Sequence, residues 1–197
     1  MNYSPLFPAP DAEKVIVATD GSCLKNPGGP SGWAWYADDN CWAAGPIFSG
    51  TNQQAELMAI LCALADIPVH IPLIIHTDSQ YAHKSITLWM KAWKAHGWKK
   101  QDGTSIANIE LMQGIDAAIQ ARTAYFSIQW VRGHNGDHRN ENADYRCNNA
   151  AHAVAKDQPV EEGPGWGKGP TGVITLPPKR PTPAAKPVQR RRPPKRK

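Results

Sequence analysis

Four acidic residues stand where a charged side chain is unfavourable unless something compensates it. Asp20 closes the apolar run VIVAT and Asp78 closes the run IPLIIHT, so each carboxylate is expected at the end of a buried strand. Glu56 and Asp144 are each expected in the first turn of a helix. An ionised carboxylate held against a protein core costs several kcal/mol unless a cation or hydrogen-bond donors meet it. The sequence therefore predicts a positive partner for these groups.

The ligand types indicate which partner suits them. Carboxylate oxygens, with neither Cys nor paired His among them, favour hard divalent cations such as Mg²⁺ or Mn²⁺ over zinc. Two such ions about 4 Å apart would neutralise the cluster and could hold both the attacking water and the leaving oxygen of a phosphodiester. The chemistry that these residues favour is metal-dependent phosphodiester cleavage.

The acids can meet only if the strands that carry Asp20 and Asp78 are neighbours. Apolar alternation predicts an antiparallel meander of three strands, a helix capped by Thr51 or Asn52, and a return strand. Because a strand, helix, strand crossover is right-handed, the return strand should lie parallel to the first and bring the two Thr-Asp pairs side by side. The expected strands are Val15–Asp20, Gly32–Asp38, Cys41–Gly50, Ile71–Asp78 and Tyr125–Val131, and further helices are expected from Ser79, over Ile109–Arg122 and over Asn140–Lys156.

Two further stretches contain residue types that could have a functional role. Trp89, Trp93 and Trp98 are interleaved with lysines in WMKAWKAHGWKK. This pattern fits a helix that packs its tryptophans on a core, and it fits equally well a surface for phosphates and bases. His134 lies in the loop RGHNGDHR, where flanking glycines favour a functional role over a buried structural one.

Charge divides the 197-residue chain into a folded part and a basic tail. Residues 1–156 hold 12 Lys and Arg against 14 Asp and Glu, whereas residues 157–197 hold 10 against 3. We expect a flexible lead-in over residues 1–13, one domain over residues 14–156, and a disordered, proline-rich basic tail over residues 157–197. Four scattered cysteines are typical of reduced thiols, and the sequence predicts no secretory signal or membrane span, so a cytoplasmic protein is expected.

The motifs, taken in order, give a resemblance to one family. TDGS with CLKNPGG, TNQQAEL, TDSQY, WMKAWKAHGW and VRGHNGDHRNENAD resemble the successive signatures of type 1 ribonuclease H. The resemblance implies an α/β fold with a five-stranded mixed sheet of order 3-2-1-4-5 flanked by helices. It also implies an endoribonuclease that uses two Mg²⁺ ions, with Mn²⁺ as a substitute, to cut the RNA strand of RNA/DNA hybrids and leave 5′-phosphate and 3′-hydroxyl ends. We expect a monomer with roles such as primer or R-loop removal.

The resemblance also implies roles for individual residues. Asp20, Glu56, Asp78 and Asp144 match the metal-binding carboxylates, and His134 matches a loop histidine that moves protons or releases product. Residues that match contacts to the RNA minor groove are Asn26, Asn52, Gln53 and Gln80; those that match a phosphate pocket are Thr51 and Asn108; those that match a basic protrusion on the DNA strand are Trp89, Lys91, Trp93, Lys94 and Trp98. Asn and Gln suit the first task because they can both donate to and accept from a ribose 2′-hydroxyl.

Two other functions remain open from the sequence alone. A DNA nuclease or strand transferase of the same fold would use a similar acid cluster on DNA, whereas a non-catalytic module would only bind the hybrid. The tail has no counterpart in the family pattern, and its basic residues favour tethering to nucleic acid. Its alternatives are docking of a partner through PPKRP or a localisation signal.

Overall fold

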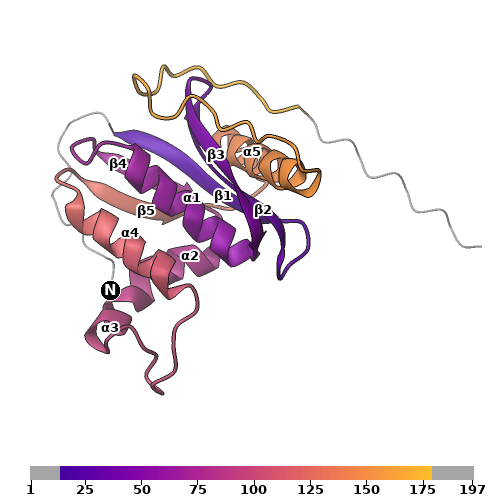
Figure 1. Ribbon diagram of the computed structural model, residues 1–197. Coiled ribbons are helices and arrows are strands. Elements are labelled where there is room, and N and C mark those ends of the chain that lie inside the picture. The colour runs from indigo at the N-terminus through magenta and orange to yellow at the C-terminus, as the bar shows by residue number, and fades with distance from the viewer. Residues whose placement is uncertain (1–13, 179–197) are drawn as a thin grey trace, which may run out of the picture.

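The computed structural model describes residues 14–178, in which five strands form a mixed sheet (Figure 1). The order across the sheet is β3-β2-β1-β4-β5, which confirms the expected topology. Strands β1, β2 and β3 are antiparallel, whereas β4 is parallel to β1 and β5 is parallel to β4. The strands are β1 (Val15–Cys23), β2 (Gly29–Asp38), β3 (Cys41–Gly50), β4 (Leu73–Thr77) and β5 (Phe126–Trp130).

Helices cover both faces of the sheet, with α1 and α4 on one face and α5 on the other (Figure 1). The helices are α1 (Asn52–Asp66), α2 (Gln80–Lys84), the π-helical turn η1 (Ser85–Trp89), α3 (Met90–Ala95), α4 (Ile109–Ala121) and α5 (His138–Ala155). Thr51 caps α1 in a capping box, in which its hydroxyl accepts from Gln54 N and its own N–H donates to the Gln54 side chain. Asp137 caps α5, which therefore begins two residues before the predicted start.

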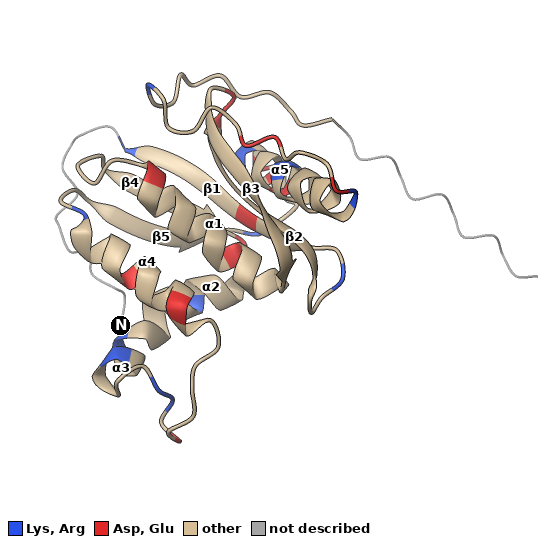
Figure 2. Ribbon diagram, in the orientation of Figure 1, with Lys and Arg blue, Asp and Glu red and all other residues tan. Residues whose placement is uncertain are grey.

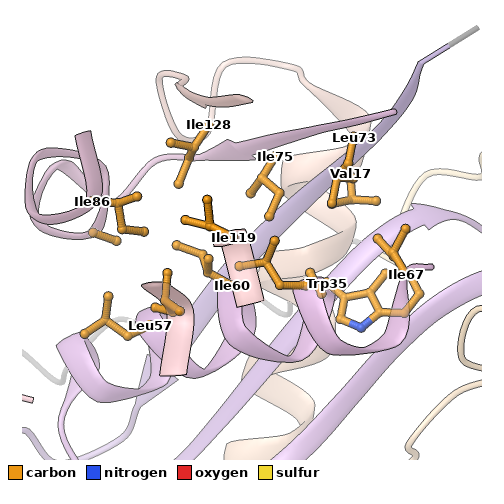
Figure 3. Packing of buried hydrophobic residues seen from close by; sticks show 14 of the residues in the cluster. Val17, Trp35, Leu57, Ile60, Ile67, Leu73, Ile75, Ile86, Ile119 and Ile128 are labelled. Carbon is orange, nitrogen blue, oxygen red and sulfur yellow. The ribbon is translucent and has the colours of Figure 1, made fainter. Parts of the chain in front are cut away.

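Alternation along the strands sends side chains into two cores. Val17, Trp35 and Ile75 pack with Leu57 and Ile60 of α1 in the main core (Figure 3). A smaller cluster, which includes Ala18, Ala34, Tyr36 and Cys147, lies between the sheet and α5. Because side chains alternate with a period of two, the β1 residues that follow Ala18 at every second position also face α5. The alternation therefore decides whether a polar side chain of β1 points to the face covered by α1 or to the face covered by α5.

A helix was predicted to begin at Ser79, after β4. The structure has three short helical segments there in place of one regular helix. Helix α2 passes into η1 and then into α3 without a break in right-handed backbone, as the αR conformations of Ser85 and Met90 show. Thr87 donates its hydroxyl hydrogen to the carbonyl oxygen of His83 within this turn. A π-helical turn inside a helix often marks a functional segment.

A buried guanidinium joins the C-terminal ends of α1 and α4. Arg122, only 3% exposed, donates to the carbonyl oxygens of Ile67 (3.2 Å), Pro68 (3.2 Å) and Ile71 (2.6 Å). Burial lowers the pKa of Arg122 to about 10. Since Ile67 and Arg122 are the C-terminal caps of α1 and α4, the two helices run in the same direction. Their N-terminal ends therefore lie at the same end of the pair.

Residues 157–178, which we call the C-terminal strap, run back along β3, the edge strand of the sheet. Main-chain hydrogen bonds join Ala44 N to Glu162 O (3.0 Å) and Gly165 N to Trp42 O (3.0 Å). The carboxylate of Asp38 accepts from the backbone N–H groups of Thr171 and Gly172, and the Trp166 side chain packs against the main core. The strap thus supplies hydrogen-bond partners to an edge that would otherwise be open.

The prediction of a disordered tail from Asp157 onward is wrong for the strap. Its glycines and prolines carry no apolar periodicity, but main-chain pairing with an edge strand requires none. Residues 1–13 and 179–197 lie outside the described residues, and with them nine of the ten basic residues of the predicted tail.

Candidate active site

Three carboxylates converge at the C-terminal end of β4, where its pairing with the neighbouring central strand β1 ends. Oxygen atoms of Asp20, Glu56 and Asp78 all lie within 4.8 Å of one another. Strand β1 continues to Cys23 because it still pairs with β2, so the prediction that Asp20 ends its strand is wrong. Asp20 nevertheless directly follows Thr19, the last β1 residue that pairs with β4, and Asp78 directly follows β4. The predicted juxtaposition of the two residues is confirmed.

The fourth acid reaches the cluster from the opposite face of the sheet. Asp144 of α5 and the thiol of Cys147 have ligand atoms within 4.8 Å of an oxygen of Asp20. Asp20 therefore belongs to both groups and links them. Glu56 and Asp144 lie beyond the first turns of α1 and α5, so their predicted positions in the first turn are wrong by about one turn.

Two glycines permit the close approaches that assemble the cluster. A Cβ at Gly21 would lie 2.2 Å from the backbone nitrogen of Glu56, so only glycine lets α1 come this close to β1. A Cβ at Gly133 would lie 2.3 Å from Asp78 Oδ2, so the loop after β5 passes directly over that carboxylate. Both glycines belong to the motifs TDGS and RGHNGDHR, and their role is to make room for Glu56 and Asp78.

Crowding and burial act together on the protonation of the acids. Burial and the neighbouring charges of Asp78 and Asp144 raise the pKa of Asp20 well above its ordinary value. Burial, followed by the charges of Asp20, Asp78 and Asp144, raises the pKa of Glu56 in the same way. Burial also raises the pKa of Asp78, although a backbone hydrogen bond and His134 oppose the change.

The cluster has the properties that a divalent metal site requires. Glu56 Oε2 is buried and has no hydrogen-bond partner among residues 14–178. An orphaned carboxylate oxygen beside two further carboxylates is unfavourable in itself, and a hard cation would satisfy all three. The donor set therefore fits divalent cations with oxygen ligands.

Asn148 lies at this site but was not predicted from the sequence. The side-chain amide of Asn148 donates to Asp144 Oδ1 (2.8 Å), and its oxygen accepts from the hydroxyl of Ser22 (2.8 Å). The spacing of four residues after Asp144 on a predicted helix could have identified Asn148, because residues i and i+4 lie on the same helix face.

His134 lies on the exposed loop that passes over Asp78. Its backbone is in the left-handed region (φ 53°), and its side chain is exposed. Trp130 at the end of β5 donates its indole N–H to the carbonyl oxygen of Asp78 (3.0 Å), which ties the start of this loop to the acid. The loop thus places His134 beside the cluster without burying it.

The predicted RNA-contacting residues lie on three neighbouring segments. Asn26 Oδ1 accepts from the backbone N–H of Asn52 (3.3 Å), so the loop after β1 meets the start of α1. Gln53 is exposed beside Asn52, and Gln80 is exposed at the start of α2, where its side chain accepts from Lys84 (3.2 Å). The structure brings Asn26 and Asn52 together directly.

The two predicted phosphate-pocket residues are the N-terminal caps of α1 and α4. Thr51 caps α1, and Asn108 stands before α4 with a left-handed backbone (φ 58°). Asn108 also donates to the hydroxyl of Tyr81 (3.2 Å). Since the two helices run in the same direction, both residues lie at the same end of the pair.

The tryptophan and lysine stretch divides its side chains between the core and the solvent. Trp93 and Trp98 are partly buried against the main core, whereas Trp89 is 41% exposed. The rings of Trp89 and Trp93 lie 5.8 Å apart. Lys91 is exposed, and Lys94 pairs with Asp116 at 2.7 Å. Basic positions colour α3 and the loop that follows it blue (Figure 2). Two tryptophans therefore anchor the segment, and Trp89 with Lys91 stays open to solvent.

Comparisons with known proteins identify the family of the chain. A sequence model of the RNase H family matches residues 12–152. The chain belongs to the ribonuclease H family. A ribonuclease H of Tropheryma whipplei is 41% identical over 154 residues, which are 78% of this chain and 94% of that protein.

Two solved structures share the fold. A type 1 RNase H with the type 2 active-site motif has a TM-score of 0.60 and 25% identity, and the match covers 79% of this chain and 78% of that one. A foamy viral protease-reverse transcriptase in complex with an RNA/DNA hybrid has a TM-score of 0.59 and 18% identity, over 74% of this chain and 22% of that one. Within residues 14–178, no helix has the length and apolar character needed to cross a membrane.

Proposed function

We propose that this protein hydrolyses the RNA strand of RNA/DNA hybrids and leaves 5′-phosphate and 3′-hydroxyl ends. The observation that carries the proposal is the convergence of Asp20 of β1, Glu56 of α1, Asp78 directly after β4 and Asp144 of α5. Its relatives are named ribonuclease H, and one structure of the same fold holds an RNA/DNA hybrid. Removal of RNA primers or R-loops is the kind of task that this activity serves.

Two Mg²⁺ ions, replaceable by Mn²⁺, would be held by these acids. Asp20, Glu56 and Asp78 form one ligand group, and Asp20 with Asp144 forms the core of the second. Bound there, the ions would supply an activated water and stabilise the leaving oxygen of the phosphodiester. The protein supplies the carboxylates at fixed spacing, and burial excludes competing water from Asp20 and Glu56, which are 7% and 6% exposed.

The surrounding residues would provide the hybrid specificity. Asn26, Asn52, Gln53 and Gln80 carry amides that can read ribose 2′-hydroxyl groups. Thr51 and Asn108 would hold a phosphate of the DNA strand at the shared end of α1 and α4. His134, exposed beside Asp78, would move a proton or help the product to leave.

The exposed part of the tryptophan and lysine stretch would hold the DNA strand. Trp89 and Lys91 face solvent, and an aromatic ring beside a lysine suits a sugar or base next to a phosphate. Trp93 and Trp98 would support this surface from the core side, and the exposed Lys94 would add a positive charge to it.

The basic residues beyond the strap would tether nucleic acid. Residues 179–197 hold nine Lys and Arg and no acid, which favours salt-dependent binding to phosphates. A chain ending at Pro178 retains the strap, so it should lose hybrid affinity and part of its salt dependence without losing fold. Unchanged affinity and salt slope would instead favour a protein-docking or localisation role. A monomeric, cytoplasmic protein with reduced thiols completes the proposal, and all four cysteines are free.

A cleavage assay on three substrates tests the activity. The full chain with Mg²⁺ is offered an RNA/DNA hybrid, double-stranded RNA and double-stranded DNA, and Asp78→Asn is the matched inactive control. We expect cutting of the hybrid alone. Cutting of DNA would support a DNA nuclease or strand transferase, and binding of the hybrid without cutting would support a non-catalytic module.

A further inference from the structure

A neutral side chain holds the acid that α5 contributes to the cluster. Asn148 Nδ2 donates to Asp144 Oδ1 at 2.8 Å and to the Asp144 carbonyl oxygen at 2.7 Å. Asn148 Oδ1 accepts from the hydroxyl of Ser22 at 2.8 Å. Ser22 lies two residues after Asp20 on β1, and Asn148 lies four residues after Asp144 on α5. Each element therefore presents one acid and one neutral polar group to the other.

The chemistry of these groups fixes the direction of the hydrogen bonds. An ionised carboxylate can only accept, so the amide of Asn148 must turn its NH₂ group toward Asp144. Its carbonyl oxygen then faces Ser22, and the hydroxyl of Ser22 must donate. Ser22 thereby specifies the orientation of the amide that donates to Asp144.

The geometry points to Asn148 as a positioning residue that holds the Asp144 carboxylate for metal binding, with Ser22 fixing the amide. The inference rests on the proposed function, in which Asp144 is a metal ligand. Asn148 occupies one lone pair of Asp144 Oδ1, which restricts the rotation of the carboxylate beside Asp20. Without this hydrogen bond the carboxylate could rotate away from Asp20.

The absence of charge on Asn148 is part of this role. A lysine or arginine here would also donate to Asp144, but its positive charge would compete with the divalent cations for the acids. The amide orients the carboxylate and leaves the negative charge of the cluster intact. Partners of this kind, when they are removed, lower metal affinity or activity by about 10- to 100-fold.

The test uses the full chain and measures metal binding without turnover. Binding of Mn²⁺ is followed by the electron paramagnetic resonance signal of the free ion, and hybrid cleavage is measured in parallel as a function of Mg²⁺ concentration. The variants are Asn148→Leu, which keeps the side-chain volume, Asn148→Ala and Ser22→Ala. Asn149→Ala is the matched control, because Asn149 is an exposed asparagine on the next position of α5.

We expect the Asn148 variants to weaken Mn²⁺ binding about tenfold and to raise the Mg²⁺ concentration for half-maximal cleavage by a similar factor. Affinity for the hybrid and the midpoint of unfolding in EDTA should stay close to those of Asn149→Ala. Ser22→Ala should give a smaller loss of the same kind, and the double change should lose little more than Asn148→Ala alone. Should Asn148→Leu fail to fold, Ser22→Ala and Asn148→Ala still decide the question.

Two results have different meanings. Metal dependence equal to that of Asn149→Ala in both Asn148 variants, while Asp144→Asn abolishes cleavage, would overturn this inference alone. Full cleavage by Asp144→Asn would overturn the metal-ligand assignment on which both this inference and the proposed mechanism depend.

Discussion

Replacement of Asp20 by asparagine should remove activity and at the same time stabilise the metal-free protein. Asp20 has carboxylate neighbours on both sides, with oxygen atoms within 4.8 Å. Two unit charges at that distance repel by about 3 kcal/mol at an effective dielectric of 20. The raised pKa values of Asp20 and Glu56 favour protonation, which removes part of this repulsion in the unchanged chain. We therefore expect the substitution to raise the free energy of unfolding by only about 1–3 kcal/mol.

The effect of Asp20→Asn on stability should depend on pH in a definite direction. A carboxyl whose pKa is higher in the folded than in the unfolded protein contributes stability below its unfolded pKa of about 4, and that contribution is lost as the pH rises through the folded pKa. The difference in stability between Asp20→Asn and the unchanged chain should therefore be small near pH 4 and grow toward neutral pH. Added Mg²⁺ should stabilise the unchanged chain far more than the variant.

The measurement is urea unfolding in EDTA and in Mg²⁺ at several pH values, with the midpoint compared at constant slope. Asn should still accept the N–H of Gly21, which now donates to Asp20 Oδ1 at 2.7 Å, so the substitution removes mainly charge. Asp102→Asn is the matched control, because Asp102 lies on an exposed loop and an asparagine oxygen can still accept its two hydrogen bonds from Thr104, so the midpoint should change little. A destabilised Asp20→Asn in EDTA at pH 7, or equal stabilisation of both chains by Mg²⁺, would refute the account of electrostatic crowding.

Three further outcomes follow from the structure. Gly21→Ala should destabilise the fold by about 1–3 kcal/mol and weaken metal binding, because the added methyl group would push α1 away from β1. Denaturant unfolding and Mn²⁺ titration measure the two effects, and an unchanged unfolding midpoint would contradict the prediction. A chain that ends at Lys156 should unfold at lower denaturant concentration than one that ends at Pro178, because only the first lacks the strap; equal midpoints would show that the strap adds no stability. His134→Ala should lower kcat for the hybrid without abolishing cleavage and with little change in hybrid affinity, as measured by steady-state kinetics; complete loss of cleavage would make His134 indispensable rather than auxiliary.

The parts of the site that follow strand order were predictable from sequence. The runs that precede Asp20 and Asp78 have the length and β-branched content of buried strands, and a right-handed crossover leaves only one way for them to be neighbours. Asp144 required more, since its approach from the opposite face depends on Gly32, where a Cβ would lie 2.3 Å from the carbonyl oxygen of Cys147. That close packing of α5 on β2 has no periodic signature.

Other features escaped the sequence reading for identifiable physical reasons. Asn148 was missed because its link to the site consists only of hydrogen bonds with Asp144 and Ser22, and asparagine on a helix surface is common. The strap lacks apolar periodicity because it is held by its main chain, by Asp38 and by the side chain of Trp166. The tryptophan stretch was ambiguous because its members divide between core and solvent, which only the tertiary fold can decide.

The guanidinium of Arg122 has a consequence far from where it lies. Helix α4 is 13 residues long, so its two ends are separated by about 20 Å. Helices of this length are stiff, and clamping two of them at one end also sets how far apart they stand at the other. Arg122 therefore helps to set the distance between Thr51 and Asn108, about 20 Å away, and with it the size of the anion that the phosphate pocket proposed there could hold.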